Sequence, residues 1–177
     1  MGYTLELWGL PVRRLVDELR APMLGADSAR DHAAPHVLER WQALAQEVSA
    51  ILASGGEVGG DRALYVVAVV RTLGEHMEAL DHTSSGGEEF RELLDGQAAR
   101  RLGRDLIDHL LGRPLADLTW AEYPSIGWAS TGELRRAADR MAPPAGEEDD
   151  PFEILRNLEL TVRIAAHTGR DIVSIYL

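Results

Sequence analysis

Two segments at opposite ends of the chain have the period-2 alternation of β-strands, and no other feature constrains the fold as strongly. Residues 3–8 and 171–177 each place alternate side chains on opposite faces of a strand. A lone strand leaves its backbone N–H and C=O groups unpaired, so these two strands have to pair with each other or with a third one. Ser125–Ala129 is the candidate for the third strand. The sequence therefore predicts a small sheet in which the two ends of the chain meet.

The chain between these strands has the apolar spacing of helices, with a repeat of about 3.6 residues. Ala63–Val70 is apolar nearly all round and rich in β-branched residues, which locally also suits a strand. The helical period resumes after it, and this favours a long, buried central helix. Residues 22–34 are predicted to be a loop, and the glycine-rich run 55–60 a linker. We expect helices over residues 12–20, 35–53, 62–81, 88–94, 97–111, 131–141 and 152–168.

These elements predict a single α+β domain over residues 1–177, mainly helical, with six or seven helices packed on the small terminal sheet. A chain of 177 residues with 45% apolar residues can bury a sizeable core. We expect this core to contain Trp41, Leu44, Val67, Val70, Leu106, Leu110, Leu158 and Val162.

Cysteine and lysine are both absent, and this removes several kinds of chemistry. A chain without Cys has no disulfide, thiolate nucleophile, zinc ribbon or iron–sulfur cluster. A chain without Lys has no P-loop lysine, no Schiff base with a pyridoxal cofactor and no protein-kinase lysine. We therefore expect no cofactor, no structural metal and no tightly bound nucleotide.

The formal net charge is −11, and it is spread over both halves of the chain. An acidic surface repels nucleic acid and anionic membranes, so we expect neither as a partner. The same charge favours the approach of a basic protein partner, although it also serves simple solubility.

The beginning of the chain lacks the basic and apolar regions of a secretory signal, and no window reaches the roughly 18 apolar residues of a membrane helix. The absence of Cys suits a reducing compartment. The sequence therefore predicts a cytoplasmic protein.

Three segments in the second half of the chain resemble a family of small bacterial proteins with a domain of unknown function. They read Leu-Ile-Asp-His-Leu-Leu-Gly-Arg-Pro-Leu (106–115), Tyr-Pro-Ser-Ile-Gly-Trp (123–128) and Glu-Leu-Arg-Arg-Ala-Ala-Asp (133–139). That family combines an N-terminal strand, a Pro-Ser-Ile-Gly-aromatic motif before a helix and a C-terminal strand. More distantly, the chain is similar to the YfbM-like proteins, some of which look like immunity proteins of toxin systems. The resemblance implies the α+β fold and points toward partner binding, but it implies no catalytic mechanism.

A cluster of large aromatic residues marks the segment 114–130. Trp120, Tyr123 and Trp128 fall within nine residues, and Ser125 lies between them in a tight turn. Aromatic residues dominate interface hot spots and also line ligand pockets, whereas the alternative is that they cover the sheet as core. Ser125 lacks the Gly-x-Ser-x-Gly elbow of a nucleophile, so its hydroxyl is expected to bond the local backbone.

Acid–histidine combinations are the candidates for catalysis. Asp105, Asp108 and His109 form one such cluster, in which Asp105 and His109 are four apart on a helix. Glu75, Glu78 and His82 share one face of the predicted third helix, with Asp81 beside them, and His32 and His36 have the spacing of two zinc ligands. Pro35 interrupts the last pair, and the chain has no Glu-x-x-His, so a solvated surface is the simpler interpretation of both.

The sequence favours a non-enzymatic cytoplasmic module that binds a protein partner, resembling an immunity protein. The partner surface is predicted to comprise Trp120, Tyr123, Ser125, Trp128 and the acidic run Glu147, Glu148, Asp149 and Asp150. Two alternatives stay open: a small enzyme that uses an acid–histidine cluster, and a small-ligand sensor with a pocket under residues 114–130. The partner's identity and the oligomeric state cannot be predicted.

Overall fold

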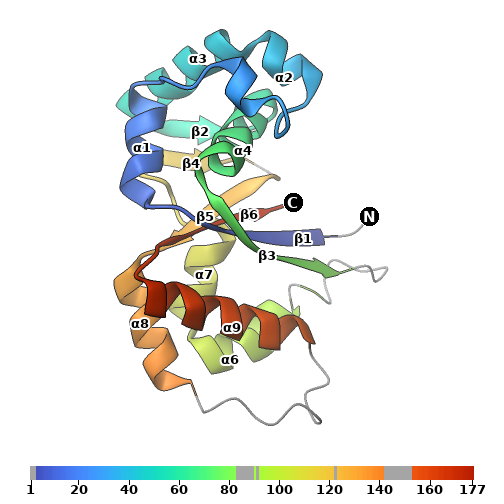
Figure 1. Ribbon diagram of the computed structural model, residues 1–177, viewed down its shortest axis with the longest axis vertical. Helices are drawn as coiled ribbons and strands as arrows, with labels where there is room; N and C mark the ends of the chain where they lie inside the picture. The colour runs from blue at the N-terminus through green and yellow to red at the C-terminus, as the bar shows by residue number, and fades with distance from the viewer. Residues whose placement is uncertain (1–2, 83–89, 91, 122, 142–152) are drawn as a thin grey trace.

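The computed structural model describes residues 3–82, 90, 92–121, 123–141 and 153–177. Its centre is a four-stranded antiparallel sheet in the order β3-β1-β6-β5. Both terminal strands lie in the middle of this sheet, where Leu5 of β1 pairs with Tyr176 of β6, so the two ends of the chain meet as predicted (Figure 1). The strands are β1 (Tyr3–Gly9), β3 (Glu75–His82), β5 (Ser125–Ala129) and β6 (Ile172–Tyr176).

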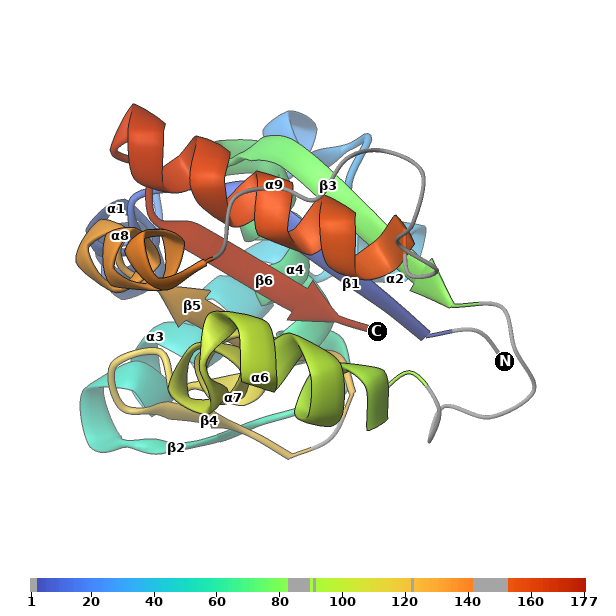
Figure 2. The same ribbon diagram turned by 90° about the horizontal axis from the view of Figure 1, so that it is seen from below.

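Helices cover both faces of the sheet, which makes the molecule a three-layered, mainly helical α+β fold (Figure 1). One face carries α1 (Val12–Arg20), the 3-10 helix η1 (Ala26–Ala29), α2 (Pro35–Glu39), α3 (Trp41–Ser54) and α4 (Asp61–Leu73). The other carries the π-helix η2 (Leu94–Ala98), α6 (Ala99–Leu102), α7 (Arg104–Gly112), α8 (Thr131–Arg140) and α9 (Glu153–Thr168). Figure 2 shows this second layer from below, with α9 beside β3.

The alternation of β1 distributes its side chains between two cores, one on each face of the sheet. Leu5 and Leu7 join the core under α7–α9, whereas Trp8 joins the core under α1–α4. Glu6 points to the same face as Trp8 and forms a bidentate ion pair with Arg71 of α4. The eight residues predicted for the core are all buried. The sheet therefore separates the two cores and contributes side chains to both of them.

The long central helix predicted over residues 62–81 is wrong in its second half. The helix α4 ends at Leu73, and residues 75–82 form β3, an edge strand of the sheet. Gly74 permits this change, because a Cβ there would lie 2.9 Å from the carbonyl oxygen of Val70 and 3.3 Å from the side chain of Trp8. The helix-like spacing of residues 71–77 concealed the strand.

Smaller differences also occur at glycines and loops. The helix predicted over residues 35–53 is divided at Arg40 into α2 and α3, and that over 97–111 is divided at Gly103, whose φ is +98°. The linker 55–60 contains β2 (Gly56–Val58), which pairs in parallel with β4 (Leu118–Trp120). The loop 22–34 contains η1. Part of the helix predicted over residues 88–94 lies outside the described residues.

The Pro-Ser-Ile-Gly segment joins β5 closely to α7. A side chain at Gly127 would collide with the carbonyl oxygens of His109 and Leu110, so only glycine lets this helix lie so near the strand. The hydroxyl of Ser125 donates to the carbonyl of Leu111, and Ser174 of β6 donates to that of Leu110. The strands thereby satisfy carbonyl groups at the C-terminal end of α7 that have no partner within the helix.

Candidate functional site

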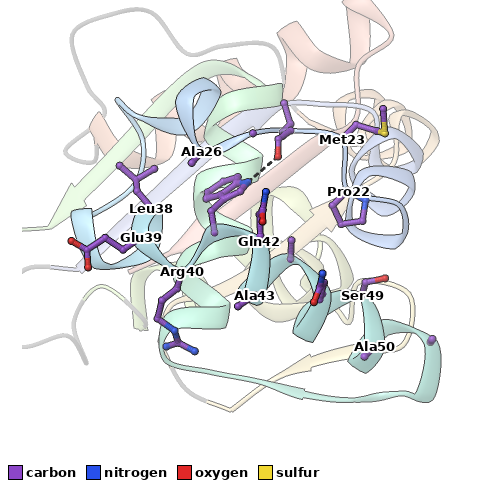
Figure 3. A pocket seen from close by; sticks show the side chains of 16 residues that line it. Pro22, Met23, Ala26, Leu38, Glu39, Arg40, Gln42, Ala43, Ser49 and Ala50 are labelled. Carbon is purple, nitrogen blue, oxygen red and sulfur yellow. Dashed lines mark hydrogen bonds between the residues drawn. The ribbon is translucent and has the colours of Figure 1, made fainter.

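A groove with a volume of about 1190 Å³ lies between the loop before η1 and the exposed side of α3 (Figure 3). Pro22 and Met23 stand on the loop side of this groove, and Ala43 and Ala50 stand on α3. We call it the α3 groove. Its complete lining is Pro22, Met23, Leu24, Gly25, Ala26, Leu38, Glu39, Arg40, Trp41, Gln42, Ala43, Ala45, Gln46, Ser49, Ala50 and Ala53.

Side chains from two helices hold the loop of this groove in place. A carboxylate oxygen of Glu18 accepts hydrogen bonds from the backbone N–H groups of Met23, at 2.8 Å, and Leu24, at 2.7 Å. The indole N–H of Trp41 donates to the Leu24 carbonyl at 2.8 Å, as the dashed line in Figure 3 shows. The Ser49 hydroxyl donates to the Arg20 carbonyl, also at 2.8 Å. The backbone of residues 20–24 is thus fixed from α1 and from α3.

The fixed loop presents an apolar side chain to solvent. Met23 is 87% exposed, more than the other large hydrophobic side chains that reach the surface in the described residues, Tyr123 (46%), Leu160 (54%) and Ile164 (45%). Methionine is flexible and polarizable, and it is common at surfaces that bind other proteins. A rigid backbone under an exposed Met lowers the entropy lost when a partner covers it.

Behind the groove lies an aromatic pair. The rings of Trp41 and Tyr65 meet edge to face with centroids 4.6 Å apart, and Tyr65 is fully buried. Burial, with a smaller contribution from the negative charge of Glu18, raises the pKa of Tyr65 to about 12. Its hydroxyl has no hydrogen-bond partner among the described residues. Tyr65 is therefore neutral at ordinary pH, and it supports the groove without supplying a charge.

The charged side chains at and beside one end of the groove, Glu39, Arg40, Glu47, Asp61 and Arg62, leave one net negative charge, with the His36 imidazole 3.5 Å from Asp61. The Arg40 guanidinium contacts two carboxylates, Asp61 at 2.6 Å and Glu47 at 3.4 Å. Glu39 also lines the groove, is exposed, and forms no ion pair with any of the described residues. A cationic group of a ligand would consequently meet Glu39, whereas an anionic group would find Arg40 already compensated.

The predicted aromatic patch is only partly exposed. Trp128 of β5 packs on the core under α1–α4, and its indole N–H donates to the Pro114 carbonyl. The Arg113 guanidinium lies 3.7 Å from its ring centroid. Trp120 is also partly buried, and its indole nitrogen has no hydrogen-bond partner among the described residues. Tyr123 lies apart from both tryptophans, against Tyr3 and Tyr176. The three aromatics thus face different surroundings.

The Ser125 hydroxyl bonds a backbone carbonyl, but not a local one as predicted: its partner is the distant Leu111 of α7. The acidic run Glu147, Glu148, Asp149 and Asp150 lies outside the described residues.

The structure pairs His109 with a residue that the sequence did not associate with it. Its Nδ1 atom lies 3.3 Å from Glu133 of α8, whereas Asp105 and Asp108 are exposed, and Asp108 lies 3.8 Å from Arg104. Asp105 and Asp108 therefore do not converge on a common centre with His109.

Glu133 belongs to the beginning of α8. Ser130 and Glu133 form the reciprocal capping box predicted for this helix, and Arg113 lies 3.0 Å from the Glu133 carboxylate. Burial alone would raise the pKa of Glu133, but the hydrogen bonds with Ser130 and the charge of Arg113 outweigh it, and the pKa is lowered. A carboxylate held ionised in this way stabilises a helix junction better than it accepts a proton.

The other predicted acid–histidine groups are also dispersed. Glu75, Glu78 and His82 lie on the strand β3 and do not share a helix face. His32 precedes α2, and His36 lies 3.5 Å from Asp61. Within the described ranges, no three His, Asp or Glu residues are arranged to hold a metal ion.

No helix in the described part of the chain is long and apolar enough to cross a membrane. No protein-family model matches the chain, and no curated protein or solved structure is significantly similar to it. The resemblances noted in the sequence therefore stay predictions, and the functional argument depends on the geometry of the α3 groove.

Sequence reasoning missed this groove. The sequence predicts only a loop over residues 22–34, because the groove depends on contacts between residues far apart in the chain. The only local signal is Met23 itself, which stands beside a proline outside any helical period.

Proposed function

We propose that this protein is a non-enzymatic cytoplasmic protein that binds another protein through the α3 groove. One observation carries the proposal: Met23 is 87% exposed on a backbone that Glu18, Trp41 and Ser49 hold by hydrogen bonds. A protein gains little from fixing an apolar side chain in water, whereas a binding surface gains affinity from that preorganisation.

The partner is a basic protein. The net charge of −11 attracts a basic surface over long range, and Glu39, which forms no ion pair with the residues that the structure describes, provides a local contact for it. The resemblance to the YfbM-like proteins, some of which look like immunity proteins, agrees with a partner-binding role. Tyr123, 46% exposed, lies on a different part of the surface and is a candidate for a secondary contact.

Affinity capture from the cells that produce the protein tests this proposal. Ala50→Arg places a long charged side chain in the groove, on an exposed helical position where it does not disturb the core. Leu160→Arg on α9 is the matched control, because it adds the same charge at another exposed position. We expect a partner that wild type and Leu160→Arg capture and Ala50→Arg loses. Identical captures by all three proteins, or no specific capture by wild type, would contradict the proposal.

A further inference from the structure

The α3 groove has the properties of a receptor for one kind of secondary structure. We infer that it binds an amphipathic α-helix with basic residues on its polar face, supplied by the partner protein. This inference rests on the protein-binding function proposed above and adds the form and charge of the bound segment.

The size of the groove fits a peptide segment better than a small molecule. Its lining follows α3 from Trp41 to Ala53, which corresponds to about 18 Å at 1.5 Å per residue. Its volume of about 1190 Å³ exceeds the roughly 300–1,000 Å³ of typical small-molecule pockets. A helix of about three turns would extend along this length.

Several backbone groups of the groove's walls are already bonded and cannot pair with an extended peptide. The α3 wall is a helix, whose backbone groups bond one another. On the loop wall, Glu18 occupies the N–H groups of Met23 and Leu24, Trp41 occupies the Leu24 carbonyl, and the Gly25 carbonyl accepts from the Ser28 N–H. A bound strand needs such groups for its own backbone, whereas a helix satisfies its backbone internally.

The side chains of the groove suit helix packing. Among the exposed α3 residues of the lining, Ala43, Ala50 and Ala53 are short, so a second helix can approach α3 at these positions, whereas Gln42 and Gln46 are long and can bond polar groups of that helix. Met23 stands opposite them and can pack against the apolar side chains of that helix. The groove thus combines three short alanines, two polar glutamines and one flexible apolar contact.

The charge of the groove selects among occupants. Glu39 has no ion-pair partner in the described part of the chain, and Arg40 is compensated by Asp61 and Glu47. A second copy of this chain also has a net charge of −11, so electrostatic repulsion disfavours self-association. A helix with Lys or Arg on its polar face complements both Glu39 and the whole molecule.

Three synthetic 18-residue peptides test the inference by isothermal titration calorimetry with the full-length protein. The first is an amphipathic helix with a Leu/Met face and a Lys/Arg face. The second replaces the basic residues with Glu, and the third keeps the basic composition but carries two central prolines that prevent the helix. We expect the basic helix to bind at least tenfold more tightly than either of the others.

The protein variants localise the binding and exclude general charge attraction. Ala50→Arg should weaken binding of the basic helix at least tenfold, Glu39→Gln about threefold at low salt, and Leu160→Arg less than twofold. Equal binding of the three peptides, no binding of the basic helix, or equal effects of Ala50→Arg and Leu160→Arg would overturn the inference. If a cellular partner is lost in Ala50→Arg while the peptides show no preference, the inference fails and the proposed function stands. If the basic helix binds but no cellular partner is captured, it is the proposed function that fails.

Discussion

At the scale of single residues, the α3 groove depends on a few side chains that act on backbone or on each other. Glu18 holds two N–H groups with one carboxylate oxygen, and Trp41 holds the neighbouring carbonyl from the opposite wall. Tyr65 stands behind them in a site that suits an apolar ring, and its hydroxyl has no hydrogen-bond partner in the part of the chain that the structure describes. This hydroxyl makes the stability of the protein sensitive to alkaline pH.

The pKa of Tyr65 is about 12 in the folded protein and 10.0 in its ordinary state. Because the pKa is higher in the folded protein, the unfolded chain ionises Tyr65 at a lower pH than the folded protein does. The free energy of unfolding is therefore unaffected by Tyr65 below pH 10 and decreases as the pH rises from 10 toward 12. We expect wild type to lose about 2–3 kcal/mol more than Tyr65→Phe over this interval, measured by urea unfolding. At pH 7, Tyr65→Phe should be at least as stable as wild type, because it removes a buried hydroxyl that has no hydrogen-bond partner among the described residues. Parallel pH profiles of the two proteins would show that Tyr65 titrates normally.

At the scale of elements, the sequence predicts what is encoded locally. The terminal strands follow from alternation, and the beginning of α8 follows from the Ser130–Glu133 spacing. The strand β3 could not be predicted in this way, because residues 71–77 also fit a helix and only the contacts of Gly74 with Trp8 and α4 show where the helix ends. The α3 groove is still less local, since Glu18, Met23 and Trp41 belong to different elements.

Close packing of β5 on α7 gives a test at this scale. Gly127→Ala inserts a methyl group against backbone oxygens, which cannot rotate away as a side chain could, so we expect a loss of more than about 2 kcal/mol in the free energy of unfolding. Gly112→Ala is the control, because a Cβ there meets no atom within 4 Å and its φ is ordinary. Chemical denaturation measures both variants, and equal stabilities would refute this account of the Pro-Ser-Ile-Gly segment.

At the scale of the whole molecule, one sheet separates two apolar cores, and the groove lies on the outside of the first helical layer. The helix α4 packs between the sheet and the outer helices, with its residues from Tyr65 to Val70 all buried. Tyr65 of α4 packs against Trp41, so α4 supports the α3 wall of the groove.

A charge at the buried centre of α4 should therefore abolish folding altogether. Val67 is 3% exposed, and Val67→Asp would place an unpaired carboxylate in the core at a cost of several kcal/mol. Leu160→Asp makes a comparable change at a position 54% exposed on α9, and we expect it to alter stability by less than about 0.5 kcal/mol. Circular dichroism during thermal unfolding distinguishes the two. A cooperatively melting Val67→Asp variant would contradict the central position of α4.

Site-specific photo-cross-linking in the producing cells tests the central claim, that the α3 groove is the binding surface, most directly. A photoreactive amino acid at Ala50 lies in the groove, and the same amino acid at Leu160 lies on α9. We predict a discrete cross-linked product from position 50, containing a basic partner protein, and no such product from position 160. The same product from both positions, or none from position 50, would contradict this account.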